Sequence, residues 1–199
     1  PRGPISPIGP RGPIQILLFR SSHPHIFAAG ADMSEMRRFT PLEAAEFARL
    51  GQETFAEIER LPMATVAIID GDCFGGALDL VMSFDLRFAT PRSRFSHPGS
   101  RLGIVTGFGG TSRWRKILDR AAARTLFLGN PVMSAAEAKE IGLVDRVGDD
   151  FSADLDRIES LDASTLQFVK ELTIHADRLS RSELLLVAER LGHIYFGQS

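Results

Sequence analysis

The chain has 199 residues, of which 44% are hydrophobic and 24% are charged, and this composition is ordinary for one globular domain with a sizeable core. Its formal net charge of −2 argues against a nucleic-acid partner, and the lack of any run of about 18 apolar residues argues against a membrane partner. Cys73 is the only cysteine, which excludes an intramolecular disulfide and a multi-cysteine metal site and favours a reducing, cytoplasmic location.

Residues 1–13 differ in composition from the rest of the chain. Proline and glycine dominate this segment, it contains no acidic residue, and it shows no apolar periodicity. Such a segment offers little apolar surface to bury, so we predict a disordered or extended lead-in. A core over residues 14–148 and a helical C-terminal region over residues 149–199 complete the predicted organisation.

Short apolar runs alternate with a helical pattern in the first half of the core. The runs Ile14–Phe19, Ala64–Ile69 and Leu86–Ala89 predict strands that are buried on both faces of a parallel sheet. Between the first two runs, Thr40 and Glu43 form a predicted capping box at the start of a helix. The order of strand, helix and strand predicts an α/β fold with parallel strands.

The second half of the chain is predicted to be mainly helical. Ser134 and Glu137 form another capping box, and Leu143–Val147 is predicted to be a brief strand. The C-terminal region fits two or three amphipathic helices, the last beginning near Ser180 and carrying an apolar stripe over residues 184–195. Such a stripe is typical of a core or a subunit interface, so we interpret this region as one that serves oligomerisation.

Two segments made of residues with small side chains follow predicted strands. Residues 26–36 (IFAAGADMSEM) come after the first strand, and residues 70–80 (DGDCFGGALDL) come after the second. Small side chains let a ligand approach the backbone, and a helix that starts at a glycine leaves N–H donors without internal partners. Two such turns on neighbouring strands can each direct one N–H at the same anionic oxygen, assisted by the helix dipole.

A purely structural interpretation of the same two turns stays open. A Gly-Gly pair before a helix is commonly a tight turn, and Ala-Gly-Ala commonly permits close packing. Neither segment matches the dinucleotide fingerprint G-x-G-x-x-G or the phosphate loop that ends in Gly-Lys-Ser/Thr. The turns by themselves therefore predict neither a nucleotide cofactor nor a definite ligand.

Four segments, in this order, resemble motifs of the enoyl-CoA hydratase/isomerase (crotonase) family. Residues 27–33 (FAAGADM) resemble its FSAGADL motif, and residues 71–89 resemble its NG-x-x-x-GGG-x-EL…CD-x-x-x-A segment. Residues 95–110 are similar to its FxxPExxxGxxPGxGGT segment, and residues 134–147 to its A-x-EAxxxGLVxxV segment. The resemblance, over residues 14–147, implies a crotonase-like α/β fold in which ββα repeats form a spiral core, with C-terminal helices.

The resemblance also implies an enzyme that takes coenzyme A thioesters as substrates and holds no tightly bound cofactor. No metal site is expected, because His23 and His25 flank a proline on a loop and no other ligand pattern lies near them. In this family the thioester oxygen lies in an oxyanion hole, and the matching donors are the backbone N–H groups of Ala31 and Gly76. The adenine of coenzyme A is held at the backbone positions that match Ala29, Ala31 and Met33, while Asp32 is expected to tie down the turn. Family members are usually trimers or dimers of trimers, so a homotrimer or hexamer is expected.

The two glutamates that a hydratase of this family uses do not both have counterparts. The first falls on Asp79, which lies three residues after Gly76 and so about one helical turn along, close to the expected hole. Aspartate is one carbon shorter than glutamate, which reduces its reach by roughly 1.5 Å. The second falls on Gly99, which offers no carboxylate. The resemblance thus favours isomerase or lyase chemistry with one carboxylate over two-glutamate hydration, because a double-bond shift adds no water.

Two other residues are candidates to replace the missing glutamate. His97 lies two residues before Gly99 and can titrate near neutral pH, which makes it a candidate base; the alternative is a loop histidine that hydrogen-bonds the backbone. Asp72 lies in the loop before the second turn. Two further functions stay open beside the isomerase or lyase: a catalytically silent acyl-CoA-binding protein, and a hydrolase of thioester or carbon–carbon bonds that uses His97.

Overall fold

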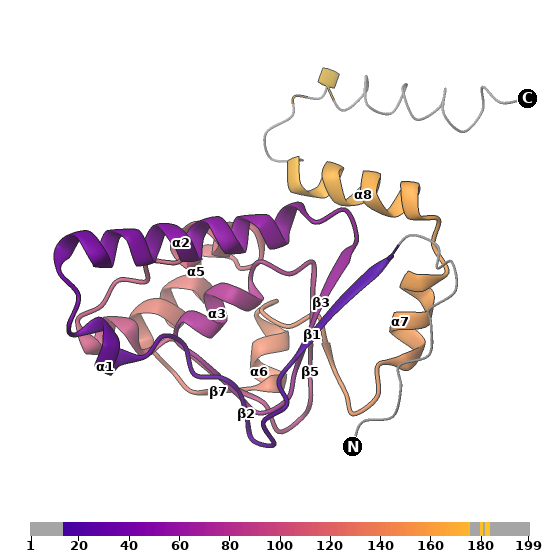
Figure 1. Cartoon of the computed structure of the whole chain (residues 1–199). Helices are drawn as coiled ribbons and strands as arrows, with labels where there is room; N and C mark the ends of the chain where they lie inside the picture. The colour runs from indigo at the N-terminus through magenta and orange to yellow at the C-terminus, as the bar shows by residue number, and fades with distance from the viewer. Residues whose placement is uncertain (1–13, 176–179, 181, 184–199) are drawn as a thin grey trace, which may run out of the picture.

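The computed structural model describes residues 14–175, 180, 182 and 183, and its strands form two four-stranded sheets (Figure 1). Sheet A is parallel throughout and has the order β1 (Ile16–Arg20), β3 (Ala64–Ile69), β5 (Leu86–Ala89) and β8 (Arg146–Val147). Sheet B has the order β2 (Ile26–Ala28), β4 (Asp72–Phe74), β6 (Arg94–Ser96) and β7 (Met133–Ser134), and β7 alone of these is antiparallel to its neighbour.

From β1 to β6 the chain alternates between the two sheets, and each of these three pairs of strands is followed by a helix. Strands β1 and β2 precede α1 (Met33–Met36) and α2 (Pro41–Arg60), and β3 and β4 precede α3 (Gly76–Val81). Strands β5 and β6 precede the 3₁₀ helix η1 (Pro98–Leu102). This succession confirms the predicted α/β fold built from ββα repeats, and because β2 pairs with β4 and β4 with β6, corresponding turns of the repeats lie side by side.

The remaining elements are short helices and two longer ones near the C-terminal end. They are α4 (Gly110–Arg113), η2 (Trp114–Lys116), α5 (Arg120–Arg124), the π-helical η3 (Thr125–Gly129), α6 (Ala135–Glu140), α7 (Ser152–Glu159) and α8 (Ala163–His175). Figure 1 shows α3 and α6 on one side of sheet A and α7 on the other. Lys170 of α8 reaches the backbone oxygen of Met63 at 3.0 Å and the carboxylate of Asp85 at 2.7 Å, which places this helix beside the start of β3.

Strand β3 is buried on both faces, as its apolar run predicts. Ala67 and Ile69 pack in the main core with α3, whereas Val66 packs on the opposite face against Phe88 and Phe151. Successive side chains of a strand point to opposite faces, so burial on both sides requires a continuous apolar run instead of an alternating one. The core therefore lies on both sides of sheet A.

The same prediction is wrong for β1. This strand forms an edge of sheet A, and within the described residues it pairs with β3 alone. The side chains of Leu17, Leu18 and Phe19 are 37%, 44% and 40% exposed. An apolar run shows that a strand can be buried, but an edge strand has a neighbouring strand on one side only, so its side chains stay partly exposed.

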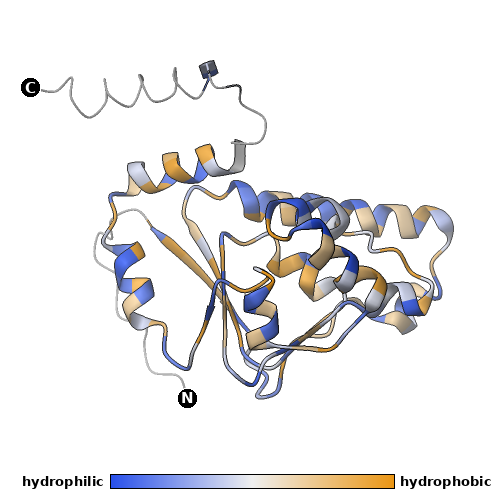
Figure 2. Cartoon of the chain, turned by 180° about the vertical axis from the view of Figure 1, so that it is seen from behind, coloured by the Kyte–Doolittle hydropathy of each residue, from blue (hydrophilic) through white to orange (hydrophobic). Residues whose placement is uncertain are grey.

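Helix starts follow the predicted capping boxes. The Thr40 hydroxyl accepts the N–H of Glu43 at 3.3 Å, and the Glu43 carboxylate accepts the N–H of Thr40 at 2.7 Å. Ser134 and Glu137 repeat this geometry at 2.7 and 3.3 Å. The backbone N–H and the hydroxyl that each glutamate accepts hold its pKa below the usual range. The box at Thr40 starts α2. Figure 2 shows hydrophilic and apolar residues alternating along this helix, which is the pattern of a helix with one face on the core.

The structure tests only part of the predictions made for the two ends of the chain. The brief strand is shorter than predicted, since β8 covers only Arg146–Val147. Ser180 and Glu183 make reciprocal capping hydrogen bonds, but the apolar stripe over residues 184–195 and the lead-in over residues 1–13 lie outside the described residues. In the described part of the chain, no helix combines the length and the apolar character that crossing a membrane demands.

Candidate active site

A pocket of about 370 Å³ lies between helix α2, the two small-residue turns and the loop that precedes α4. Its wall is mostly apolar and includes the side chains of Met36, Phe47 and Phe108. A volume and a lining of this kind are typical of small-molecule sites. Of the predicted site residues, the wall contains those of both turns and the candidate base, which are Ala29, Ala31, Met33, Gly76 and His97.

The two turns are in direct backbone contact at Gly30 and Gly76. Gly30 has a φ of +85°, and a Cβ atom built on it would lie 2.8 Å from the nitrogen of Gly76 and 3.1 Å from the oxygen of Phe74. Only glycine combines this backbone conformation with this separation. The first turn therefore brings its backbone against the second because residue 30 carries no side chain.

Ala31 and Gly76 both line the pocket, and within the described residues the N–H group of neither donates to a protein acceptor. Gly76 is the first residue of α3, where helix N–H groups have no partner inside the helix. The neighbouring Gly75 N–H donates to Ser96 at 2.9 Å, which ties the second turn to β6. Backbone donors without a protein partner, on residues that line an apolar pocket, are suited to bind an anionic or polarised oxygen.

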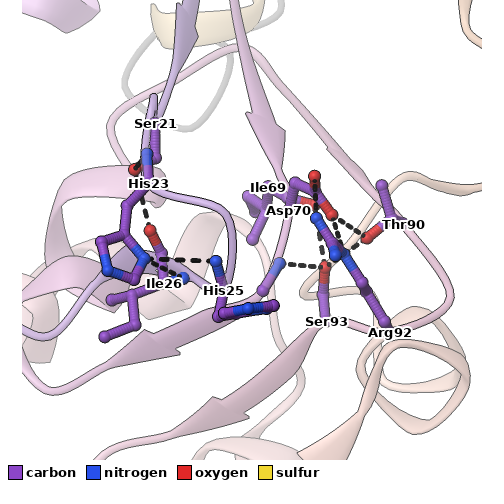
Figure 3. Close-up of polar contacts among 10 residues, drawn as sticks. Ser21, His23, His25, Ile26, Ile69, Asp70, Thr90, Arg92 and Ser93 are labelled. Atoms are coloured by element: carbon purple, nitrogen blue, oxygen red, sulfur yellow. Dashed lines mark hydrogen bonds and ion pairs between the residues drawn. The ribbon is translucent and has the colours of Figure 1, made fainter.

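Polar side chains hold the loops that connect sheet A to sheet B and so position the turns (Figure 3). His23 Nδ1 accepts the backbone N–H of Ile26 at 3.0 Å, at the first residue of β2. Ser93 Oγ donates to the carbonyl of Ile69 at 2.8 Å, at the last residue of β3. Asp70 links the same loops through hydrogen bonds from Thr90 and Arg92.

Residues of α2 and α4 fix the loop that forms another wall of the pocket. Gln52 donates to the carbonyl of Gly107 at 2.6 Å, and Arg113 donates to the carbonyl of Phe108 at 2.7 Å. Phe108 lies edge-on to Phe47 and Phe55 of α2, with ring centroids 5.2 and 5.7 Å apart. Aromatic packing and side-chain hydrogen bonds therefore hold this wall of the pocket in a defined shape.

Asp79 lies one turn along α3 from Gly76, as predicted, but its carboxylate is fully buried behind the pocket wall. One carboxylate oxygen accepts a hydrogen bond from the hydroxyl of Thr106. The other, Oδ1, faces His97 Nε2 at 3.5 Å, and neither of these two atoms has a hydrogen-bond partner in the described structure. Cys73 lies nearby, and its burial, together with the charge of Asp79, raises the pKa of its thiol, so the thiol stays neutral.

The structure separates the other acidic candidates from the pocket. Asp72 lies on β4 and forms an ion pair with Arg94 at 2.7 Å, outside the pocket wall. Asp32 is the N-cap of α1 and accepts the N–H of Ser34 at 2.7 Å, which is the turn-stabilising role expected of it. Thr106, which sequence reasoning missed, is brought to Asp79 by a loop that carries no periodic pattern.

Comparisons with known proteins agree on one family. A family model described as enoyl-CoA hydratase/isomerase matches residues 15–183. The crotonyl-CoA hydratase of Syntrophomonas wolfei is 37% identical over 134 residues, which are 67% of this chain and 52% of that protein. The probable enoyl-CoA hydratase echA8 of Mycobacterium tuberculosis is 35% identical over 178 residues, which are 85% of this chain and 68% of that protein.

Solved structures show the same fold. The enoyl-CoA hydratase of Thermoplasma volcanium superposes with a TM-score of 0.84 at 26% identity, covering 92% of this chain and 75% of that one. A putative enoyl-CoA hydratase of Thermobifida fusca in complex with acetoacetyl-CoA gives 0.82 at 21% identity, covering 94% and 79%, a likeness that concerns the fold alone. The chain spans about half the length of the first curated relatives that it matches.

Proposed function

This chain belongs to the enoyl-CoA hydratase/isomerase family, and from that premise we propose that it binds an acyl-CoA thioester in the pocket between the two small-residue turns. The thioester oxygen accepts the N–H groups of Ala31 and Gly76, which stabilise the enolate that forms when a proton leaves the acyl chain. The observation that carries this proposal is the contact between Gly30 and Gly76, because it brings two turns with unpartnered donors to one end of an apolar pocket. Each such donor typically lowers a barrier by about 3–4 kcal/mol.

The reaction that this site supports best is a double-bond shift or a related lyase step. Water addition in the family uses two carboxylates, but Gly99 has none, and Asp79 is the carboxylate that lies next to the pocket wall. A double-bond shift removes a proton at one carbon and returns it at another, so a single acid–base unit is sufficient. This argument favours isomerase or lyase chemistry over hydration.

The coenzyme part of the substrate is proposed to lie along the first turn. Ala29, Ala31 and Met33 line the pocket there, and the small alanine side chains leave the backbone open to an adenine ring. Coenzyme A enters as part of the substrate and leaves as part of the product, so no tightly bound cofactor is required. We propose in addition that the chain assembles as a homotrimer or hexamer.

The direct test is turnover of matched 2-enoyl-CoA and 3-enoyl-CoA thioesters by the purified protein. We expect interconversion of but-3-enoyl-CoA and crotonyl-CoA to be faster than formation of the 3-hydroxyacyl product, and Asp79→Asn to lose most of the interconversion. Liquid chromatography resolves the two enoyl isomers, which have the same mass, and mass spectrometry identifies the hydrated product by the mass of the added water. Hydration that outpaces interconversion, or an Asp79→Asn variant with wild-type turnover, contradicts the single-carboxylate reaction.

A hydrolase remains the second candidate, favoured by the position of His97 in the pocket wall. In that reaction His97 would activate water against the thioester or a β-keto carbon–carbon bond. Release of free coenzyme A from butyryl-CoA, detected with a thiol reagent, distinguishes it from the isomerase. Calorimetry with butyryl-CoA identifies the third possibility, since tight binding without any product is the signature of a silent acyl-CoA-binding protein.

A further inference from the structure

The imidazole of His97 occupies a defined position between the core and the pocket. Its side chain is 5% exposed, and its ring lies edge-on to Phe127 with centroids 5.0 Å apart. Nε2 is buried and faces Asp79 Oδ1, whereas the pocket wall includes the residue itself. The ring therefore bridges the buried carboxylate and the space where the acyl chain is proposed to lie.

The carboxylate of Asp79 is buried with one oxygen unpaired among the described residues, so solvent does not compensate for the missing hydrogen bond. It is fully buried, and only one of its oxygens, the one that Thr106 contacts, is hydrogen-bonded in the described structure. Burying an incompletely paired carboxylate is costly, and such groups in native proteins call for a functional or structural reason. The ring nitrogen Nε2 of His97 lies 3.5 Å from the second oxygen, and the backbone of Gly110 packs against the same oxygen. Catalytic contacts of this kind are often long without substrate and shorten when it binds.

Gly99 leaves room for the Cε1–Nδ1 edge of the His97 ring because it carries no side chain. A Cβ atom at Gly99 would lie 2.9 Å from the carbonyl oxygen of Ile104, 3.3 Å from His97 Cε1 and 3.4 Å from His97 Nδ1. A glutamate at this position would therefore crowd both the loop and the imidazole. Nδ1 of His97 lies beside the Cβ position of residue 99, where hydratases of the family carry their second glutamate. The imidazole therefore offers a base close to the position of the missing carboxylate.

We propose that His97 is the catalytic base of this site, acting through Nδ1, and that Asp79 is a positioning residue that acts through His97 instead of touching substrate. The proposal rests on the thioester function above. Asp79 keeps the ring proton on Nε2, so Nδ1 presents a lone pair to the pocket.

The proton transfer balances without any further reactant. Nδ1 takes the proton from the α-carbon, the C–H electron pair forms the carbon–carbon bond of the enolate, and the carbonyl pair moves to the oxygen between Ala31 and Gly76. The imidazolium then returns a proton to the α-carbon, which produces isotope exchange. With a 3-enoyl thioester it returns the proton to the γ-carbon instead, which produces the 2-enoyl isomer.

The test uses α-proton exchange of but-3-enoyl-CoA in D₂O, together with calorimetric binding of butyryl-CoA. Loss of a general base typically costs at least about 100-fold, so we expect this loss of exchange in His97→Gln and His97→Asn, with the Kd for butyryl-CoA changed by less than about twofold. Added imidazole should restore part of the exchange to His97→Ala, because it supplies the missing base in the cavity. His25→Gln, which changes an exposed histidine outside the pocket, is the matched control.

Asp79→Asn separates the positioning role from a direct one. A base misplaced by about 1 Å loses up to about 100-fold in rate, so exchange should fall in this variant, and imidazole should not restore it. The double variant His97→Ala with Asp79→Asn should be no slower than His97→Ala alone, because the two residues act as one unit.

Three other results would each refute either the role of His97 or the proposed function. Exchange that survives in both His97→Gln and His97→Asn but disappears in Asp79→Asn makes the carboxylate the base and refutes the proposal. Wild-type protein that binds butyryl-CoA but exchanges no proton refutes His97 as a base and leaves thioester binding standing. Wild-type protein that does not bind butyryl-CoA refutes the proposed function itself, and the role of His97 falls with it.

Discussion

At Gly30 a single missing side chain decides whether the second turn keeps a free donor. Because a Cβ atom there would lie 2.8 Å from the nitrogen of Gly76, we expect Gly30→Ala to displace or cover that N–H. Loss of one donor of this kind typically reduces kcat by about 100-fold to 1,000-fold. Steady-state kinetics with a 3-enoyl-CoA substrate measure the loss, and a thermal melt reports whether the fold survives.

The control for this variant is Gly103→Ala. Gly103 has a similar backbone conformation, with φ of +72°, but nothing lies within 4 Å of the position of its Cβ. It therefore carries the same backbone strain, about 1–2 kcal/mol, without obstructing a donor. If both variants lose activity to the same extent, strain explains the effect and the donor at Gly76 does not.

Sequence spacing predicted the positions of the candidate site residues along their elements better than it predicted which way their side chains point. The distance of three residues correctly put Asp79 one turn after Gly76, but helix phase alone does not say whether a carboxylate in the first turn faces a pocket or the core. That choice depends on Thr106 and His97, which come from loops without a periodic pattern. Site residues on irregular backbone are therefore the ones that sequence reasoning weighs least well.

Helix α2 contains a glycine where intrinsic propensity favours alanine, and packing explains it. A Cβ atom at Gly51 would lie 2.2 Å from Cδ1 of Phe108 and 2.7 Å from Cε1. Alanine in a helix interior is normally more stable than glycine by about 1 kcal/mol, but overpacking costs about 1–3 kcal/mol. We expect Gly51→Ala to lower the free energy of unfolding and, by pushing Phe108 toward Gly76, to reduce turnover.

Urea denaturation provides the measurement, and Thr54→Ala provides the matched control. Thr54 is an exposed residue of the same helix, so alanine there should raise stability slightly through propensity alone. Opposite signs for the two alanine substitutions support the packing explanation. A Gly51→Ala variant that is more stable than wild type would mean that Phe108 moves aside at little cost.

Long elements were predictable from the sequence, and the short strands of sheet B were not. The capping box at Thr40 and the apolar run of β3 gave correct positions for α2 and β3. Strands β2 and β4 cover only three residues each and lie inside the segments interpreted as strand-to-helix turns. Three residues carry too little periodicity to separate a strand from a turn, and their pairing is set by contacts between distant repeats.

For the whole molecule, the proposed assembly leads to a prediction about mass. Large apolar side chains remain exposed on the single chain, among them Leu128 at 75% and Val132 at 60%, and an interface would cover some of these side chains. We expect sedimentation at micromolar concentration to give the mass of three or six chains. A mass of one chain across a wide concentration range, in protein that still turns over thioester, contradicts the proposed trimer or hexamer.

The contact between Gly30 and Gly76 has a practical consequence for anyone who maps this pocket by mutagenesis. Amide hydrogens belong to the peptide link, so every replacement except proline retains them. Replacing residue 31 or residue 76 itself therefore leaves its donor in place, and a side-chain substitution reaches the donor only indirectly, as Gly30→Ala does. Replacing the Ala31 amide by an ester through semisynthesis deletes the hydrogen alone, and is the substitution that this architecture calls for.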